Sequence, residues 1–465
     1  MPLSIQELGS ATSGRICWAE MPPRDGPLTT IGRLVIDSRE VQPGDIFWAL
    51  PGQHAHGADF AYEALARGAL GVVADRPVTP LPGCFSLQVA DPQLALWELA
   101  HSYRQHLTAT VVAVTGSVGK TTTRQMIHTV LSSALRGIAS QKNYNNHLGV
   151  PLSLLAARFN DDYAVLEVAG SAAGEIAALA QLAEPDIGVI TCVADAHLGS
   201  FGGYQQVLQA KGELLQVLGS HACAVLPGDD RRVRQLAADC GAEVTWFGRG
   251  ADNDVTAARV HSGNGQLCFQ VEDQAFCIPV WGRHHLGSAL AAIAVGRLFG
   301  RSLSEIADAL STFESVPMRC EVLQCGAVTA INDTYNACPV SMKAALALLG
   351  EFGNSGRRIV ACGDMVELGE AAQRLHYQLG QDVIALSAAQ RLFACGKFAG
   401  TVACGARDAG MPDEAVTVCE DVEQTADKLK TTIQPGDVVL AKGSRKMQME
   451  RVVQSLAEHS IARVA

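Results

Sequence analysis

AVTGSVGKTTT, residues 113 to 123, is the segment from which the architecture of this chain follows. An apolar run of β-formers, Val111 to Val114, passes into a glycine loop and then into a stretch compatible with a helix. This order is typical of a phosphate-binding loop, whose glycines let backbone N–H groups approach an anion at the start of a helix. Lys120 adds a point charge, and Thr121 offers a hydroxyl to Mg²⁺. We therefore predict a nucleotide site formed by Gly116, Ser117, Val118, Gly119, Lys120, Thr121 and Thr122.

The loop departs from the usual eight-residue form, because the residue five positions before Gly119 is Val114 and not glycine. The shorter pattern Gly-x-x-Gly-Lys-Thr is also compatible with an ordinary glycine turn. The strand before the loop and the run Thr121 to Thr123 after it favour the nucleotide site, because a phosphate-binding loop requires that context.

Composition limits the function classes. The chain has 465 residues, of which 48% are hydrophobic, and this length predicts about three domains. A net charge of −11 without a basic stripe argues against nucleic acid and anionic membranes as partners. The fourteen cysteines form no Cys-x-x-Cys pair, and some, such as Cys192 and Cys362, lie in apolar runs, so we expect reduced thiols. The sequence shows no signal peptide and no membrane span, which predicts a cytoplasmic protein.

Strands and helices alternate along the chain, which predicts an α/β protein with domains at residues 1–107, 108–314 and 315–465. In the first, residues 34–50 are predicted as two strands around Pro43-Gly44-Asp45, and residues 59–75 as a helix that stops at Gly68 and a strand. After the phosphate loop, YAVLEV (163–168), IGVITCV (187–193) and CAVLPG (223–228) predict a parallel sheet. In the third, RRIVACGD (357–364) and DVVLAKGS (437–444) predict buried strands that end in ligand-binding loops.

Three further side chains follow from this arrangement. Glu167 ends the strand 163–168, where a carboxylate can share Mg²⁺ with Thr121, although a chance acidic residue at a strand end is the alternative. His197 follows the next strand, and we favour a metal or phosphate role over a structural one. Lys211 lies in the helical run 204–218, where its simplest interpretation is a solvated helix lysine.

These residues together resemble the Mur ligase family, and the resemblance extends over the whole chain. IDSREVQPGDIFWALPGQHAHGADF (36–60) resembles the family's uridine-nucleotide domain. Five other segments resemble the branch of the family that adds D-alanyl-D-alanine to UDP-N-acetylmuramoyl-tripeptide. They are TGSVGKTTT (115–123), NYNNHLGVPLSLL (143–155), DTYNACPVSMKAAL (333–346), CGDMVELGEAAQRLHYQLG (362–380) and DVVLAKGSRKMQMERVV (437–453). The resemblance implies a small α/β uridine-nucleotide domain, a central P-loop parallel-sheet ATPase domain and a C-terminal Rossmann-like α/β domain.

The resemblance also implies a mechanism, with ATP and Mg²⁺ as cofactors and a monomer as the working unit. ATP phosphorylates the terminal carboxylate of the UDP-linked tripeptide, and the amine of D-alanyl-D-alanine attacks the resulting acyl phosphate. Phosphorylation removes the negative charge that repels the nucleophile and supplies a leaving group, so the protein has to position the reactants and neutralise charge. This reaction belongs to cytoplasmic peptidoglycan precursor synthesis.

Site residues are carried over by the same resemblance. The implied catalytic residues are Lys120, Glu167, His197 and Lys211, and the implied metal ligands are Thr121, Glu167, His197 and Lys211. Lys211 matches a lysine that CO₂ carbamylates in related enzymes, which turns a cation into a long carboxylate. From the third domain, Arg319, Asp333, Tyr335 and Asn336 are implied to reach ATP. The implied substrate residues are Ser38 and Arg39 for the uridine nucleotide, Asn145, Asn146, and the segment with Lys442, Ser444 and Arg445 near the incoming dipeptide.

The chain departs from the family pattern near the nucleotide. Relatives carry asparagine where this chain has Cys192, His285 and Ser288, so the adenine and metal surroundings are expected to differ. Two alternatives stay open: an amide ligase with another amino acceptor, such as a cyanophycin-like or folate-glutamyl enzyme, and a non-catalytic paralogue that binds UDP-sugar peptides. The first and third domains match the cell-wall type, and a binding protein has no need of a phosphate loop with metal ligands. The sequence leaves open whether the third residue of the tripeptide is diaminopimelate or lysine.

Overall fold

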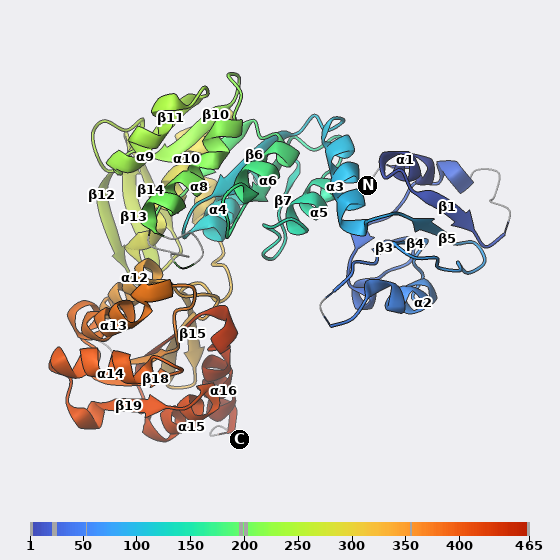
Figure 1. Cartoon of the computed structure of the whole chain (residues 1–465). Coiled ribbons are helices and arrows are strands. Elements are labelled where there is room, and N and C mark those ends of the chain that lie inside the picture. The colour runs from blue at the N-terminus through green and yellow to red at the C-terminus, as the bar shows by residue number, and fades with distance from the viewer. Residues whose placement is uncertain are drawn as a thin grey trace.

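The computed structural model describes residues 3–20, 26–52, 54–194, 199, 203–353 and 356–462. Within them the strands form three sheets, of five, nine and six strands. Figure 1 shows these sheets in three bodies, an N-terminal one in blue, a central one in cyan to yellow and a C-terminal one in orange to red. The predicted three-domain α/β fold is therefore confirmed, while the domain boundaries at 107/108 and 314/315 stay predictions.

The N-terminal sheet has the strand order β1-β5-β4-β3-β2. Its body contains α1 (Ile5–Ala11), β1 (Arg15–Trp18), β2 (Leu34–Val35), β3 (Ile46–Trp48), α2 (Ala61–Ala66), β4 (Gly71–Ala74), β5 (Phe85–Gln88) and α3 (Pro92–Arg104). Strands β2 to β5 run parallel, and β1 joins β5 antiparallel. The predicted turn separates β2 from β3, and its Gly44 has a φ of 90°, a conformation that glycine adopts without steric cost.

The central sheet has the order β14-β13-β12-β11-β10-β9-β6-β8-β7. The central body contains β6 (Thr110–Thr115), α4 (Lys120–Ser132), β7 (Gly137–Ala139), α5 (Gly149–Ala156), β8 (Tyr163–Glu167), α6 (Glu175–Ala183), β9 (Ile187–Ile190), α8 (Tyr204–Val217), β10 (Cys223–Pro227), α9 (Arg231–Leu236), β11 (Glu243–Gly248), β12 (Val255–Gly263), β13 (Gln266–Val271), β14 (Gln274–Ile278), α10 (Leu286–Leu298) and α11 (Leu303–Ser311). Strand β6 lies between β8 and β9, so the phosphate loop leaves the sheet where the strand order reverses, the position at which such sheets bind ligands.

The parallel pairing predicted for residues 163–168, 187–193 and 223–228 is confirmed, and it extends to β12; the last two strands of the sheet were not predicted. Strands β13 and β14 pair antiparallel, forming a meander with β12. Short turns join these strands, one of them at Asn264-Gly265, and buried and exposed residues alternate along β13. Alternation and two-residue turns are typical of antiparallel hairpins, whereas a parallel connection needs a longer crossover.

Each face of the central sheet packs against a separate set of helices. Val112 and Val114 of β6 join a core with α4, α10 and α11, whereas Val111 and Ala113 join a core with α3, α5, α6 and α8. Alternate residues of a strand point to opposite faces, so one apolar run serves both cores. This two-sided burial explains why the strand reads as a continuous hydrophobic stretch.

The C-terminal sheet has the order β15-β16-β20-β17-β18-β19, with β15 antiparallel to β16 and the other neighbours parallel. Its elements are β15 (Glu321–Cys325), β16 (Val328–Asp333), α12 (Pro339–Gly350), β17 (Arg358–Cys362), α13 (Ala372–Ser387), β18 (Arg391–Cys395), α14 (Ala399–Asp408), β19 (Val416–Cys419), α15 (Val422–Thr432), β20 (Val438–Lys442) and α16 (Glu450–Ala462). Helices α12, α13 and α14 share one core, and α15 and α16 share the other.

Helix α3 fastens the N-terminal body to the central one. Within this helix, Trp97 Nε1 donates to the carbonyl of His147 at 2.6 Å, and the Tyr103 hydroxyl donates to the carbonyl of Ala157 at 2.7 Å. Figure 1 shows α3 beside α5, with the N-terminal sheet on its far side. The last helix of the predicted first domain is therefore packed on the second.

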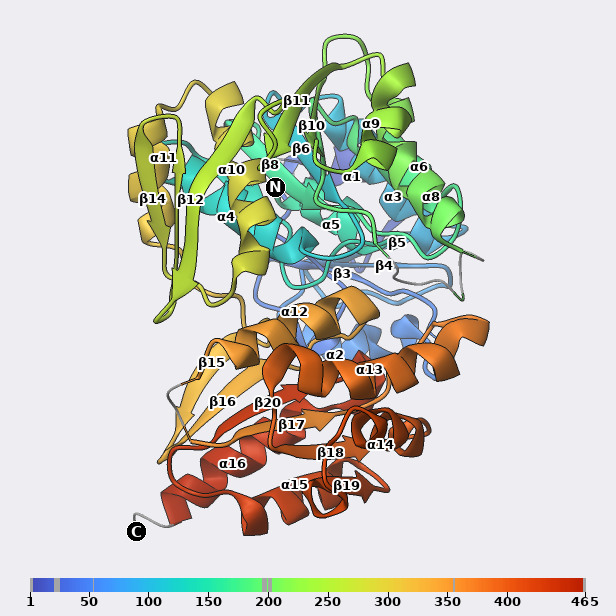
Figure 2. The same cartoon turned by 90° about the vertical axis from the view of Figure 1, so that its left-hand side faces the viewer.

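The central and C-terminal bodies meet below the meander, as Figure 2 shows. Trp281, which follows β14, stacks on Phe352 with ring centroids 4.6 Å apart. Nearby, the Ser262 hydroxyl donates to a carboxylate oxygen of Glu351 at 2.9 Å. These two contacts place the end of α12 against the meander.

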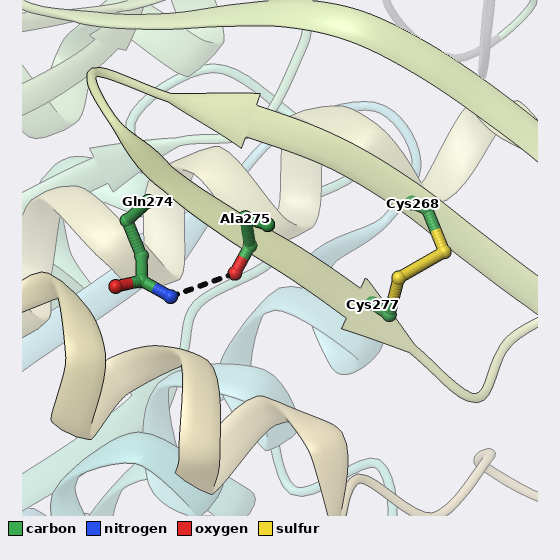
Figure 3. The surroundings of a disulfide bond; sticks show 4 residues. All are labelled: Cys268, Gln274, Ala275 and Cys277. Carbon is green, nitrogen blue, oxygen red and sulfur yellow. Dashed lines mark hydrogen bonds between the residues drawn. A yellow bond between two sulfur atoms is a disulfide. The ribbon is translucent and has the colours of Figure 1, made fainter.

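One pair of cysteines contradicts the expectation of reduced thiols. Cys268 and Cys277 face each other across β13 and β14 and form a disulfide (Figure 3). Their neighbours Phe269 and Phe276 point to the opposite face, where their rings stack 5.2 Å apart in the core. The other twelve cysteines are free thiols. Among the described residues, no helix combines the length and apolar character needed to cross a bilayer.

Candidate active site

The phosphate loop between β6 and α4 is held in shape by the residues that follow β9. Gly116 and Gly119 have φ values of 144° and 82°, which favour glycine at both positions. A Cβ atom at Gly116 would lie 2.0 Å from Thr191 Oγ1, so the loop could not approach β9 with any other residue there. Thr191 Oγ1 donates to the carbonyl of Val118 at 2.6 Å. The Ser117 hydroxyl donates to the carbonyl of Ala194 and accepts from its N–H, each at 3.0 Å.

Lys120 is the first residue of α4, and no side chain caps the start of that helix in the described structure. The free N–H groups there and the helix dipole form an anion site. Lys120 Nζ donates to the carbonyl of Gly116 at 2.9 Å, which folds the ammonium back over the loop. Burial lowers the pKa of Lys120, Glu167 opposes this shift, and the positive charge of Arg319 adds to it. The predicted phosphate-binding residues thus lie together as a cradle, which comprises residues 116–122, at the start of α4.

Glu167 ends β8 and lies 1% exposed beside the cradle. One of its carboxylate oxygens accepts from the Thr121 hydroxyl at 2.9 Å, and the other accepts from Asn145 Nδ2 at 2.8 Å. Arg124, one helical turn after Lys120, lies 3.5 Å from the first oxygen. The predicted neighbours Thr121 and Glu167 are therefore in contact.

Arg319 belongs to the C-terminal body and reaches this cluster across the interface between the two bodies. Its Nη2 donates to Thr121 Oγ1 at 2.9 Å, and its guanidinium lies 4.1 Å from the centre of the Tyr335 ring. Two residues predicted to serve ATP from the third domain are thus stacked together, and one of them touches the phosphate loop.

The remaining C-terminal residues gather where β16 and β20 end side by side, because Asp333 pairs in register with Lys442. Lys442 Nζ lies 2.5 Å from Asp333 Oδ2 and donates to the carbonyl of Asn336 at 2.8 Å. Lys442 is 1% exposed, so its ammonium holds these two residues in place and does not face solvent. Ser444 is also buried, with its hydroxyl accepting from the N–H of Val366 at 2.9 Å.

Arg445 differs from its two neighbours in the predicted dipeptide segment. Its side chain is 57% exposed and pairs with Glu450 at 2.8 Å. Of the three residues predicted there, Arg445 is the one whose charge faces the surface, while Lys442 and Ser444 build the strand end beneath it.

Lys211 contradicts the interpretation of a solvated helix lysine. It lies on α8 at 2% exposure, and its Nζ donates to the carbonyl of Gly170 at 3.5 Å. Burial lowers the pKa of Lys211 to about 7, and the charge of Lys120 contributes to the shift. His197, predicted as its partner at a second metal, lies outside the described residues.

A magnesium ion fits the cluster at Thr121 and Glu167. A carboxylate and a hydroxyl are hard oxygen ligands of the kind that Mg²⁺ prefers, and Mg²⁺ at nucleotides usually takes its other ligands from phosphates and water. No three His, Cys, Asp or Glu side chains come together as a metal site in the described part of the chain. A dedicated all-protein cage is therefore absent there, whereas a site shared with a nucleotide is compatible with the donors.

The predicted substrate residues in and near the N-terminal body have different surroundings. Arg39 is 79% exposed and paired with Asp37, whereas Ser38 is buried and donates to Glu63 at 3.3 Å. Asn146 accepts from the N–H groups of residues 148 and 149, so its side chain begins α5. Arg39 is thus available to a ligand at the surface, and Asn146 has a local structural task.

Two of the three departures from the family pattern, Ser288 and Cys192, contact the phosphate loop or the helix after it. Ser288 accepts from the Thr123 hydroxyl at 2.9 Å, which ties α10 to α4. The Cys192 thiol contacts the carbonyl of Val118 at 3.7 Å. His285 is buried at the end of a short 3₁₀ turn, and burial lowers its pKa well below the ordinary value. The neutral imidazole is therefore the form present at neutral pH.

Two functional neighbours were missed by the sequence predictions. Arg124 was passed over, although its spacing of four residues from Lys120 puts it on the same face of a helix. Thr191 was also missed, because its contact with the loop depends on the order of strands in the sheet.

Comparisons with known proteins agree with this geometry. Family profiles match at residues 30–95 (Mur ligase family, catalytic domain), 114–296 (Mur ligase middle domain) and 318–445 (Mur ligase, glutamate ligase domain). A UDP-N-acetylmuramoyl-tripeptide--D-alanyl-D-alanine ligase of Bacillus subtilis is 34% identical over 438 residues, 93% of this chain and 95% of the relative.

Solved structures give the same result. A crystal structure of MurF from Acinetobacter baumannii superposes with a TM-score of 0.85 at 30% identity, covering 98% of this chain and 99% of that one. MurF ligase of Thermotoga maritima in complex with ADP gives a TM-score of 0.79 at 29% identity, with 93% and 98% covered. With three family profiles in order and relatives matched nearly end to end, the chain belongs to the Mur ligase family.

Proposed function

We propose that this chain is an ATP-dependent ligase that joins D-alanyl-D-alanine to UDP-N-acetylmuramoyl-tripeptide through an acyl phosphate. The contact between Arg319 and Thr121 carries the proposal, because it brings the C-terminal body onto a phosphate loop that already holds a carboxylate, Glu167. The relatives bearing that name support the choice of substrates. Because ATP and UDP-linked sugars are both made in the cytoplasm, we place the reaction there.

The first step needs a phosphoryl group aligned with a carboxylate and shielded from its charge. The N–H groups at the start of α4 and the Lys120 ammonium hold the phosphates in our proposal, and Arg319 approaches from the opposite side. Thr121 and Glu167 would hold Mg²⁺, which supplies charge neutralisation between the nucleotide's phosphates. These groups stabilise the charge that spreads over the transferred phosphoryl oxygens.

The C-terminal residues act through position. Asp333 and Asn336 are held by Lys442, and Tyr335 supports Arg319 from below its guanidinium plane. We propose that this unit moves as one toward the nucleotide, with Arg445 near the incoming dipeptide. One chain supplies every proposed site residue, so we propose a monomer as the working unit.

Lys211 is proposed to act after modification. A neutral lysine amine adds to CO₂ to give a carbamate and a proton, and the low pKa of Lys211 makes the neutral amine available at neutral pH. The carbamate would face a second metal together with His197. The negative charge of the carbamate would also be attracted by the Lys120 ammonium, which repels the protonated form of Lys211.

The test is ADP release by the purified protein with both substrates and with each omitted. We expect release to require both the UDP-linked tripeptide and D-alanyl-D-alanine, because the acyl phosphate forms on a bound carboxylate and is consumed by the dipeptide amine. Tripeptides ending in diaminopimelate and in lysine should be compared, since the third residue is unassigned. Equal ADP release without either substrate would contradict the proposal.

A further inference from the structure

One short segment, Ser140 to Asn146, contacts Glu167, the carboxylate proposed to hold Mg²⁺, at two places. The N–H of Glu167 donates to the Ser140 hydroxyl at 3.1 Å. Asn145 Nδ2 donates to the side chain of Glu167 at 2.8 Å, and the N–H of Ala169 donates to the carbonyl of Asn145 at 2.8 Å. Hydrogen bonds to this segment therefore hold both the backbone and the side chain of Glu167.

The middle of the segment is fastened by a buried cation. Arg124 Nη1 donates to the carbonyl of Lys142 at 2.9 Å and lies 3.5 Å from Glu167 Oε2. The Arg124 side chain is only 7% exposed, so its guanidinium cannot leave the segment without breaking buried contacts. Lys142 has a φ of 47°, a left-handed conformation that is uncommon for a residue with a side chain. The backbone at Lys142 is thus held in one defined shape beside Glu167.

The same residue extends to the N-terminal body. Lys142 Nζ lies 3.0 Å from Glu40 Oε1, and the negative charge of Asp37 also acts on it. Glu40 belongs to the short 3₁₀ turn Ser38–Glu40, which contains both residues predicted to bind the uridine nucleotide. The ion pair therefore links that turn directly to the residue whose carbonyl accepts from Arg124.

We propose that Lys142 is a positioning residue that couples binding of the uridine nucleotide at Ser38 and Arg39 to the orientation of Glu167 at the Mg²⁺-nucleotide site. This inference rests on the proposed function, from which the two ligands are taken. The physical path consists of the Lys142 ion pair, its backbone carbonyl, Arg124 and the Glu167 carboxylate. Each link is a direct contact between described residues.

The expected coupling is modest. The side chains of Lys142 and Glu40 are 61% and 54% exposed, and exposed ion pairs contribute little because water and salt screen them. We expect the uridine-nucleotide substrate to tighten binding of Mg·ADP about two- to fivefold more in the wild type than in a variant without the pair. Higher salt should reduce the difference.

The experiment measures Mg·ADP binding by calorimetry with and without saturating UDP-N-acetylmuramoyl-tripeptide, and the ratio of the two affinities is the coupling factor. Lys142→Met removes the ion pair and leaves the carbonyl, so its affinity for Mg·ADP alone should match the wild type while the coupling factor falls. The reversed pair Glu40→Lys with Lys142→Glu should restore at least half of the lost coupling. Arg76→Met, which breaks an exposed pair with Asp59 in the N-terminal body, is the matched control and should change nothing.

The outcomes separate the two proposals. A wild type that binds no tripeptide contradicts the proposed function and this inference with it. A wild type that binds tripeptide but shows a coupling factor of one overturns this inference alone. An unchanged coupling factor in Lys142→Met, or an equal loss in Arg76→Met, overturns it as well, because the Lys142 contact would then carry nothing specific.

Discussion

Replacement of Lys211 by alanine is predicted to remove nearly all ligase activity. The structure places this lysine at 2% exposure with a pKa of about 7, against the ordinary value of 10.5. At pH 7 about half of such an amine is neutral, compared with roughly 0.03% of an ordinary lysine, so the form that reacts with CO₂ is enriched about a thousandfold. Alanine can carry no carbamate, and short carboxylic acids such as formate or acetate should restore part of the activity by filling the gap.

The assay is the initial rate of ADP release with all substrates present, measured from pH 6 to pH 8. A pKa of about 7 implies that the neutral amine rises about tenfold across this interval, and activity should rise with it. Preparations depleted of CO₂ should lose activity and regain it when bicarbonate is added, which separates carbamylation from other titrations. A Lys211→Ala enzyme with wild-type activity, or a rate indifferent to bicarbonate, would refute the reasoning and leave the rest of the site unaffected.

Three further predictions concern the loop, the domains and the disulfide. Lys120→Met should fold normally and lose activity about a hundredfold or more, as is common when a charge aimed at the transferring group is removed; a variant that keeps a tenth of the rate would contradict this. ATP and the UDP-linked tripeptide together should compact the molecule, because Asp333 must approach the nucleotide held by Lys120, and an X-ray scattering profile that stays unchanged at saturating ligand would count against closure. Cys268→Ser with Cys277→Ser should lower the free energy of unfolding by about 2–3 kcal/mol relative to the oxidised wild type, measured by denaturant titration, whereas equal stability of oxidised and reduced protein would exclude a contribution from the bond.

The phosphate loop and the parallel strands could be predicted because local sequence specifies them. Glycines with positive φ, a lysine and a hydroxyl at the start of a helix form their site within a few residues. Strands buried on both faces read as continuous apolar runs, and Glu167 could be placed because parallel strands end at one edge of a sheet. The antiparallel meander was overlooked, although the short turn at Asn264-Gly265 signals it.

The features that the sequence did not predict depend on burial and on pairing between distant parts of the chain. A lysine in a helical run looks the same whether it faces water or a core, so the burial of Lys211 could not be read from its neighbours. The position of Lys442 near the dipeptide stays a prediction, but its pairing with Asp333, 109 residues earlier in the chain, was not predicted. Such a pairing depends on which strands lie side by side, and periodicity carries no information on that order.

The tethers between β9 and the phosphate loop have a consequence for how quickly product can be exchanged. Thr191 and Ala194 form hydrogen bonds with the loop, and Lys120 donates to the carbonyl of Gly116. The loop therefore keeps its shape through hydrogen bonds within the protein, and the departure of a nucleotide breaks none of them. The entropy cost of ordering the loop arises once, when the protein folds, and not at each binding event. ADP can therefore leave at every turnover without the loop becoming disordered and ordering again.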